Sequence, residues 1–249
     1  MQARRTSFPS GALFWLASSR PQRVLTLAAP PALPRLLAHS GHDVFAVDRE
    51  VSTIRSLTAS GTITGVVAQP ESLPFDPCQF DRVMAHQNFH TFAPGLVLSE
   101  MARVLRPGGA ATVTYLVRDD SVPWVRRLVN LVHQVDADAM TGEYGTSSVR
   151  TLLESAYFPE HDTKDFRVWM PVSRHALIDM VGAIPGIASL DADLRAMVLD
   201  DVGALYDDAS PRPDGLSLPY ELRCWRAWVD HRELTAPITT DTAALVIPI

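Results

Sequence analysis

The stretch "HQNFHTF", residues 86–92, gathers hydrogen-bonding side chains into one short segment. A general base or a set of groups that position a substrate could come from His86, Gln87, Asn88 and His90. His86 and His90 have the spacing of metal ligands on a helix, but they follow a predicted strand and lack a nearby carboxylate. We therefore expect no metal site. In the alternative interpretation, His86 caps the strand, and Phe89 and Phe92 pack in the apolar core below it.

A second candidate is the carboxylate of Asp48, which ends the apolar stretch "DVFAVD". An acid at the end of a second strand, about 20 residues after the first turn, can accept two hydrogen bonds from a ribose diol. Asp48 has that spacing from Ala28. Its alternative role is to cap a helix that starts near Glu50.

A third candidate region is "RDDSVPW", residues 118–124, which follows another predicted strand. Arg118 could bind a substrate carboxylate through two parallel hydrogen bonds, with Trp124 as a further contact. A salt bridge from Arg118 to Asp119 or Asp120 is the interpretation we favour.

Alternating strand and helix patterns place these residues on a parallel α/β sheet. Strands are predicted over residues 23–28, 43–48, 63–68, 81–86, 110–117, 166–170 and 218–229. Helices are predicted over residues 10–19, 31–40, 51–59, 94–105, 122–135, 173–184 and 191–208, and a polar stretch through Asp165 reads as irregular. "RPGG" is expected to stop the helix that ends at Leu105.

Composition narrows the function classes. The 249 residues carry a formal net charge of −6 without a cluster of basic residues, which argues against nucleic-acid binding. Two distant cysteines favour a reducing, cytoplasmic location over a disulfide framework. Paired arginines at Arg4 and Arg5 before a short apolar run loosely mimic an export signal, but a helix covering the sheet is the favoured interpretation. No stretch has the length of a membrane span.

Four stretches in order resemble the class I S-adenosylmethionine (SAM)-dependent methyltransferases, most of all the small-molecule enzymes related to trans-aconitate and ubiquinone/menaquinone methyltransferases. They are "GHDVFAVDRE", "ESLPFDPCQFDRVMAHQNFHTF", "EMARVLRPGG" and "LVRDDSVPWVRRL". The resemblance implies a Rossmann-like, doubly wound sheet of order 3-2-1-4-5-7-6, mostly parallel with an antiparallel last strand. "LPYELRCWRAWV" fits that strand. It implies one domain over residues 1–234 with additions near 136–165 and 189–210, and a tail over 235–249.

By that resemblance, SAM would be bound by Ala28, Ala29, Pro30, Asp48, Gln69 and His86. Gln69 stands where many relatives carry an acid for the adenine amine, and its carbonyl can accept the same bond. The acceptor would be a small molecule that meets Gln87, Asn88, Arg118 and Trp124, with His86 and His90 as candidates for catalysis.

One departure from the family concerns the turn after the first strand. The family reads D-L-G-x-G-x-G, whereas this chain reads "TLAAPPA", with Ala28, Pro30 and Ala32 at the glycine positions. Glycine allows positive φ and close approach of a ligand, while proline lacks an N–H donor. We therefore expect weak SAM binding. Two functions stay open: a small-molecule methyltransferase, and an inactive relative that binds another ligand or a protein partner.

Overall fold

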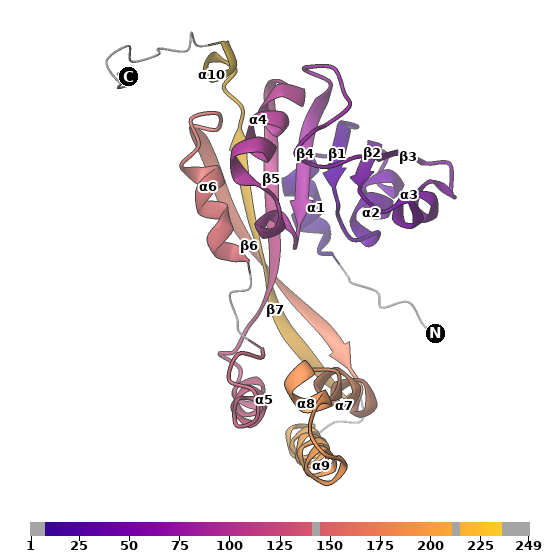
Figure 1. Ribbon diagram of the computed structural model, residues 1–249, viewed down its shortest axis with the longest axis vertical. Coiled ribbons are helices and arrows are strands. Elements are labelled where there is room, and N and C mark those ends of the chain that lie inside the picture. Colours follow the sequence, from indigo (N-terminus) through magenta and orange to yellow (C-terminus); the bar gives the residue numbers. More distant parts are fainter. Residues whose placement is uncertain (1–7, 141–144, 211–214, 236–249) are drawn as a thin grey trace, which may run out of the picture.

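In the computed structural model, which describes residues 8–140, 145–210 and 215–235, the chain builds a seven-stranded sheet of order β3-β2-β1-β4-β5-β7-β6 (Figure 1). The neighbouring pairs among β1 to β5 are parallel, whereas β7 is antiparallel to both β5 and β6. The expected order and the antiparallel "LPYELRCWRAWV" strand are confirmed. The strands are β1 (Arg23–Leu27), β2 (Asp43–Asp48), β3 (Ile63–Val67), β4 (Phe80–His86), β5 (Leu105–Arg118), β6 (Glu160–Val172) and β7 (Leu216–Trp228).

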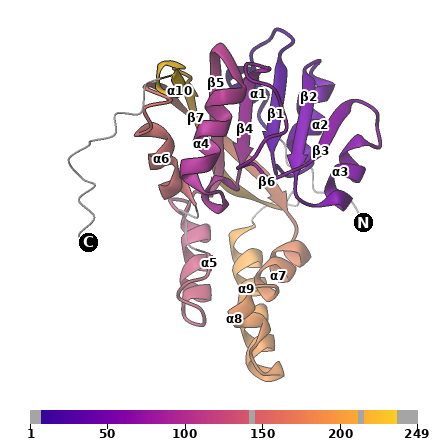
Figure 2. The same cartoon turned by 45° about the horizontal axis from the view of Figure 1, so that its top comes forward.

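Helices cover both faces of the sheet because successive strand residues alternate between the faces. Val83 and Ala85 of β4 join the core under α4 (Pro94–Val104) and α6 (Val149–Leu153). Met84, between them, joins the core under α1 (Ser10–Ala17), α2 (Ala32–His39) and α3 (Val51–Thr58) on the opposite face (Figure 2). Short elements complete this part: η1 (Phe89–Thr91), η2 (Thr146–Ser148) and α10 (Arg232–Thr235).

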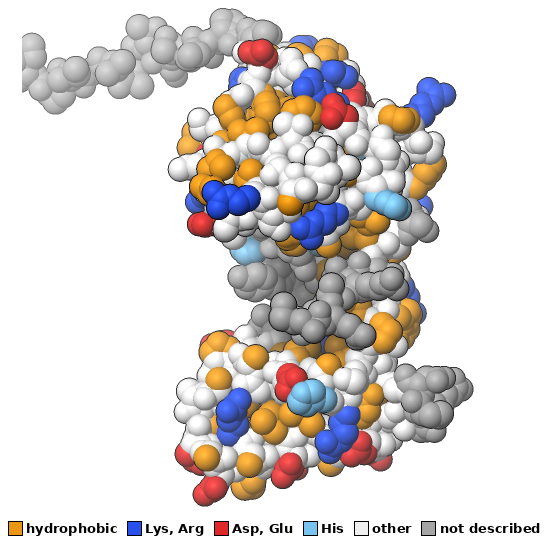
Figure 3. Space-filling view, turned by 90° about the vertical axis from the view of Figure 1, so that its right-hand side faces the viewer, with side chains coloured by type: hydrophobic (Ala, Val, Ile, Leu, Met, Phe, Trp, Pro, Cys, Tyr) orange, Lys and Arg blue, Asp and Glu red, His pale blue; other side chains and the backbone are white. Residues whose placement is uncertain are grey.

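A separate helical lobe is built on the far ends of β5, β6 and β7. These strands have 13 or 14 residues, against five to seven in β1 to β4, so they extend past the carboxyl ends of their neighbours. The lobe has its own apolar core, and Figure 3 shows it set apart from the body of the sheet. It consists of α5 (Pro123–His133), α7 (Arg174–Gly182), α8 (Pro185–Ala188) and α9 (Ala192–Ala209).

The helix α4 ends at Val104, directly before the "RPGG" segment that is expected to stop it. Two expected strand boundaries are corrected: β5 begins at Leu105 and not at residue 110, because Leu105 already pairs with Phe80 before the register shifts so that Ala110 pairs with Arg82. The segment therefore bulges out of β5, which Gly108 permits with a φ of 77°. The polar stretch thought irregular through Asp165 enters β6 at residue 160, because this edge strand pairs on one side only and leaves polar side chains in solvent.

Parts of the predicted termini fall outside the described residues. Arg4 and Arg5 lie there, as does the expected tail from residue 236 onward. Among the helices that the structure describes, none is long and apolar enough to cross a membrane.

Candidate functional site

The turn between β1 and α2 contains a left-handed residue although it has no glycine. Ala28 has a φ of 44°, and its N–H donates to the carbonyl oxygen of Val47 at 2.7 Å. This conformation costs about 1–2 kcal/mol for a residue that has a Cβ atom. A run of alanine and proline therefore does not predict a left-handed residue from sequence alone. The backbone thus adopts at Ala28 a conformation that glycine usually supplies.

The same turn offers a ligand few hydrogen-bond donors. Pro30, Pro31 and Pro34 have no N–H group. The Leu33 N–H donates to the carbonyl oxygen of Pro30 at 3.1 Å, and the Ala28 N–H is used by β2. A helix N-terminus usually attracts anions through its free N–H groups, and α2 has lost part of that capacity.

Asn88 connects the end of β4 to this turn. Its amide nitrogen donates to the carbonyl oxygens of Leu27 at 2.8 Å and Ala28 at 2.7 Å. These two acceptors fix the orientation of the amide, because its oxygen could not face them. The Oδ1 atom is then buried without a hydrogen-bond partner among the described residues. A buried orphan acceptor is costly, so this atom is suited to a ligand N–H.

Asp48 and Gln69 stand at the ends of β2 and β3, beside the turn. Oδ1 of Asp48 accepts the backbone N–H of Glu50 at 2.8 Å. Glu50, not Asp48, is the N-cap of α3, and no described residue donates to the second oxygen of Asp48. Gln69 is exposed. These groups and Asn88 could hold the nucleoside and ammonium ends of SAM, whereas its carboxylate meets few donors.

His86 ends β4 on the α1 face of the sheet. Its Nδ1 lies 2.7 Å from Oγ1 of Thr114, and the ring of Phe8 packs edge-on at 5.6 Å. Burial lowers the pKa of His86 to about 4, so the imidazole is neutral at pH 7. The sequence did not point to Thr114, because the contact depends on the register between β4 and β5.

The side chain of Gln87 binds the backbone of β5. It has a φ of 64°, and its side-chain amide both accepts the Leu116 N–H at 3.1 Å and donates to the Leu116 carbonyl oxygen at 3.4 Å. The amide thereby continues the pairing of β4 with β5 beyond the last strand residue.

His90 lies apart from His86. Its backbone N–H donates to the Tyr115 hydroxyl at 3.0 Å, and its Nδ1 lies 3.1 Å from the same atom. Tyr115 is fully buried in the core on the α4 face, and its hydroxyl also lies 3.2 Å from Oγ of Ser148. The two histidines are therefore placed on opposite faces of the sheet.

Arg118 and Trp124 face the helical lobe. Arg118 forms a bidentate salt bridge with Asp120, with an Nε–Oδ1 distance of 2.6 Å, and it also donates to the carbonyl oxygen of Met140. Trp124 packs on the core of the lobe. The favoured interpretation of Arg118 as a salt-bridge partner is confirmed, with Asp120 as the acid.

The left-handed Ala28 leads to a stability prediction. Glycine at this position removes about 1–2 kcal/mol of strain and adds up to about 1 kcal/mol of chain entropy cost. Ala28→Gly should therefore leave the free energy of unfolding unchanged or raise it by about 1 kcal/mol. Ala204→Gly, at an exposed site inside α9, should lower it by about 1 kcal/mol. Urea denaturation measures both, and equal losses would contradict the left-handed assignment.

The chain is similar in sequence to known methyltransferases. A family model described as a methyltransferase domain matches residues 31–113. An uncharacterized methyltransferase of Mycobacterium tuberculosis is 31% identical to this chain over 227 residues, which cover 90% of each protein. An uncharacterized methyltransferase of Schizosaccharomyces pombe is 31% identical over 102 residues, 41% of each protein.

Solved structures share the fold. A candidate type II methyltransferase from Anaeromyxobacter dehalogenans superposes with a TM-score of 0.67 at 21% identity, covering 91% of this chain and 98% of the other. A candidate methyltransferase of an antibiotic biosynthesis pathway from Anabaena variabilis gives a TM-score of 0.57 at 16% identity, covering 86% and 94%.

Proposed function

Because this chain belongs to the class I SAM-dependent methyltransferase family, we propose that it transfers the methyl group of SAM to a small-molecule acceptor. The proposal rests on the Oδ1 atom of Asn88, which is buried and has no hydrogen-bond partner among the described residues. This atom lies where the parallel strands β1 and β4 end side by side. Ligands of open α/β sheets bind beyond these strand ends.

The donor would be held by residues from four strand ends. The second carboxylate oxygen of Asp48 would accept from the ribose, and the carbonyl of Gln69 from the adenine amine. Oδ1 of Asn88 would accept from the ammonium group of the amino-acid end. Ala28 and Ala29 would border the ligand through their backbone. When bound, SAM supplies a methyl group made electrophilic by its sulfonium sulfur.

The turn predicts that this binding is weak. Pro30 lacks an N–H where a glycine loop would donate, and each lost charge-assisted hydrogen bond costs about 1.5–3 kcal/mol. Each 1.4 kcal/mol is a factor of about ten in affinity. A site that would otherwise bind in the micromolar range therefore moves towards the millimolar range.

On the acceptor side we assign the contact to His86, which lines an apolar cavity. Gln87 and Arg118 are engaged with the protein itself, and His90 lies on the other face. Methyl transfer depends mainly on the alignment of donor and acceptor, so it does not require a charged catalytic group. A second candidate function, a scaffold without enzymatic activity, is favoured by the proline-bearing turn.

Calorimetric titration with SAM and S-adenosylhomocysteine tests the proposal. We expect a dissociation constant between about 0.1 and 1 mM for the wild-type protein, and at least about tenfold weaker binding by Asp48→Ala, which loses the ribose acceptor. Asp43→Ala, at the opposite end of the same strand, should bind as wild type. Absence of binding at several millimolar, or equal affinity of Asp48→Ala and wild type, would favour the scaffold.

A further inference from the structure

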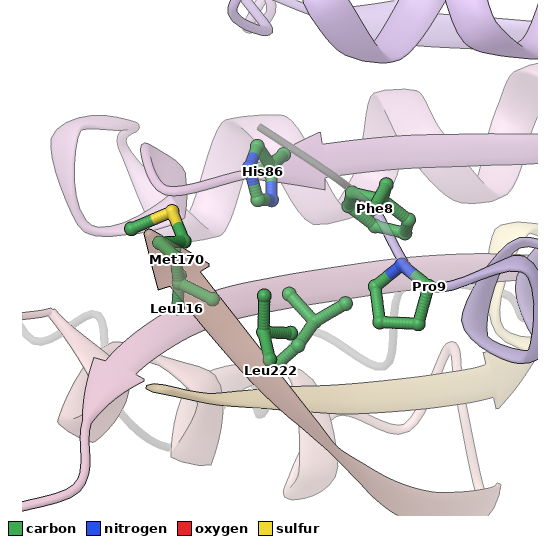
Figure 4. A pocket seen from close by; sticks show the side chains of 7 residues that line it. Phe8, Pro9, His86, Leu116, Met170 and Leu222 are labelled. Carbon is green, nitrogen blue, oxygen red and sulfur yellow. The ribbon is translucent and has the colours of Figure 1, made fainter. Parts of the chain in front are cut away.

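A small apolar cavity lies where β4 ends and the longer strands β5, β6 and β7 continue towards the helical lobe. It has a volume of about 30 Å³. Figure 4 shows the side chains around it, with His86 from the end of β4 and Leu222 from β7. The cavity is lined by His86 and by apolar side chains that include Phe8, Leu116, Val168, Met170 and Leu222.

His86 gives this cavity its hydrogen-bonding group. One ring nitrogen, Nδ1, is engaged with Thr114. No described residue forms a hydrogen bond with the other nitrogen, Nε2. Because burial lowers the pKa of the ring to about 4, Nε2 belongs to an uncharged imidazole at neutral pH. The cavity therefore offers one neutral hydrogen bond amid apolar contacts.

Among the residues that the structure describes, none that lines this cavity carries a permanent charge. The nearest arginine along β5, Arg118, is neutralised by Asp120 and further bound to the carbonyl oxygen of Met140. A carboxylate entering the cavity would lose its hydration without gaining a counter-charge, and such burial is strongly unfavourable. This argues against the anionic acceptors that an arginine beside the site would suggest.

We propose that the cavity binds the apolar end of an uncharged acceptor that carries a hydroxyl group, with that hydroxyl on Nε2 of His86. A hydroxyl can donate or accept, so it matches either tautomer of the ring. The volume admits about two water-sized groups, such as a methyl group and the edge of a ring. His86 and Asn88 are two residues apart, so their Cα atoms lie within about 7 Å of each other.

That the occupant is the methyl acceptor rests on the proposed function, whereas binding itself does not. The test therefore uses the full chain without SAM and measures binding by ligand-observed NMR titration. The probes are p-cresol, toluene and 4-hydroxybenzoate. We expect p-cresol to bind about fivefold more tightly than toluene, the contribution of one net hydrogen bond. The anionic 4-hydroxybenzoate should bind at least about tenfold more weakly than p-cresol.

Two substitutions separate the hydrogen bond from the apolar contacts. His86→Phe should retain toluene binding and abolish the preference for p-cresol. Met170→Trp should fill the cavity and weaken both probes at least about tenfold. Met197→Trp, on α9 where the side chain is 63% exposed, is the matched control and should bind as wild type. Val168→Phe, from the same strand as Met170, is a second filling variant if Met170→Trp does not fold.

Three results would overturn the proposal. They are 4-hydroxybenzoate binding as tightly as p-cresol, no p-cresol binding at about 10 mM, and unchanged probe binding by both filling variants. A titration to about 10 mM detects even ligands with millimolar dissociation constants. Retained p-cresol binding in a protein that does not bind SAM would refute the proposed function and leave the cavity proposal standing.

Discussion

A variant carrying Ala28→Gly, Pro30→Gly and Ala32→Gly should bind SAM at least about tenfold more tightly than the wild-type protein. Pro30→Gly returns one N–H donor to the turn, and a hydrogen bond to a charged ligand group contributes about 1.5–3 kcal/mol. The other two changes remove Cβ atoms from the turn and from the first residue of α2. Ala28 already has a left-handed φ of 44°, so glycine fits there without rearrangement.

Calorimetry on the triple variant and the wild type measures this gain. Pro185→Gly, at the first residue of α8 in the helical lobe, controls for the general effect of removing a proline at a helix start. It should leave SAM affinity unchanged. Unchanged affinity in the triple variant, with its melting temperature preserved, would show that the turn is not what limits binding.

The second large effect concerns the pH dependence of stability through His86. Its pKa is about 4 in the folded protein and near 6.5 when unfolded. As the pH falls below 6.5, the unfolded chain takes up the proton first, so stability present above pH 6.5 is lost as the pH falls towards 4. The loss from this residue amounts to up to about 3 kcal/mol.

His86→Phe should therefore show a flatter pH dependence than the wild type between pH 6.5 and 4, by up to about 3 kcal/mol in the free energy of unfolding. Urea denaturation at several pH values gives the difference. Burial also lowers the pKa of His42, but His42 is present in both proteins and cancels in the comparison. His161→Phe, at an exposed position of β6, should keep the wild-type curve. Parallel curves for His86→Phe and wild type would refute the assignment.

Several features of the fold were predictable because short segments of sequence determine them. The apolar runs ending in Asp48 and His86 indicated strands, and the structure ends β2 and β4 at these residues. The alternation in "LPYELRCWRAWV" and its place last in the chain predicted β7. Strand propensity and alternation act over a few residues, so they can be read without knowing what the segment packs against.

Other features depend on which strands become neighbours. The β4–β5 register sets His86 against Thr114. His90 contacts the next residue of β5, Tyr115, whose side chain points to the opposite face of the sheet. The left-handed Ala28 and the amide of Asn88 hold each other in place, although 60 residues separate them in the chain. Local propensity disfavours that φ for alanine, and only contacts with β2 and β4 offset its cost.

The sequence by itself determined the order of the elements, the acid at the end of β2 and the absence of a glycine loop, because each of these features depends only on residues that are close together in the chain. Tertiary structure decided the shape of the turn, the orphan oxygen of Asn88 and the apolar cavity beside His86. These arise where β1, β4, β5, β6 and β7 come together from distant parts of the chain. The side-chain contacts there follow from packing, which no local pattern encodes.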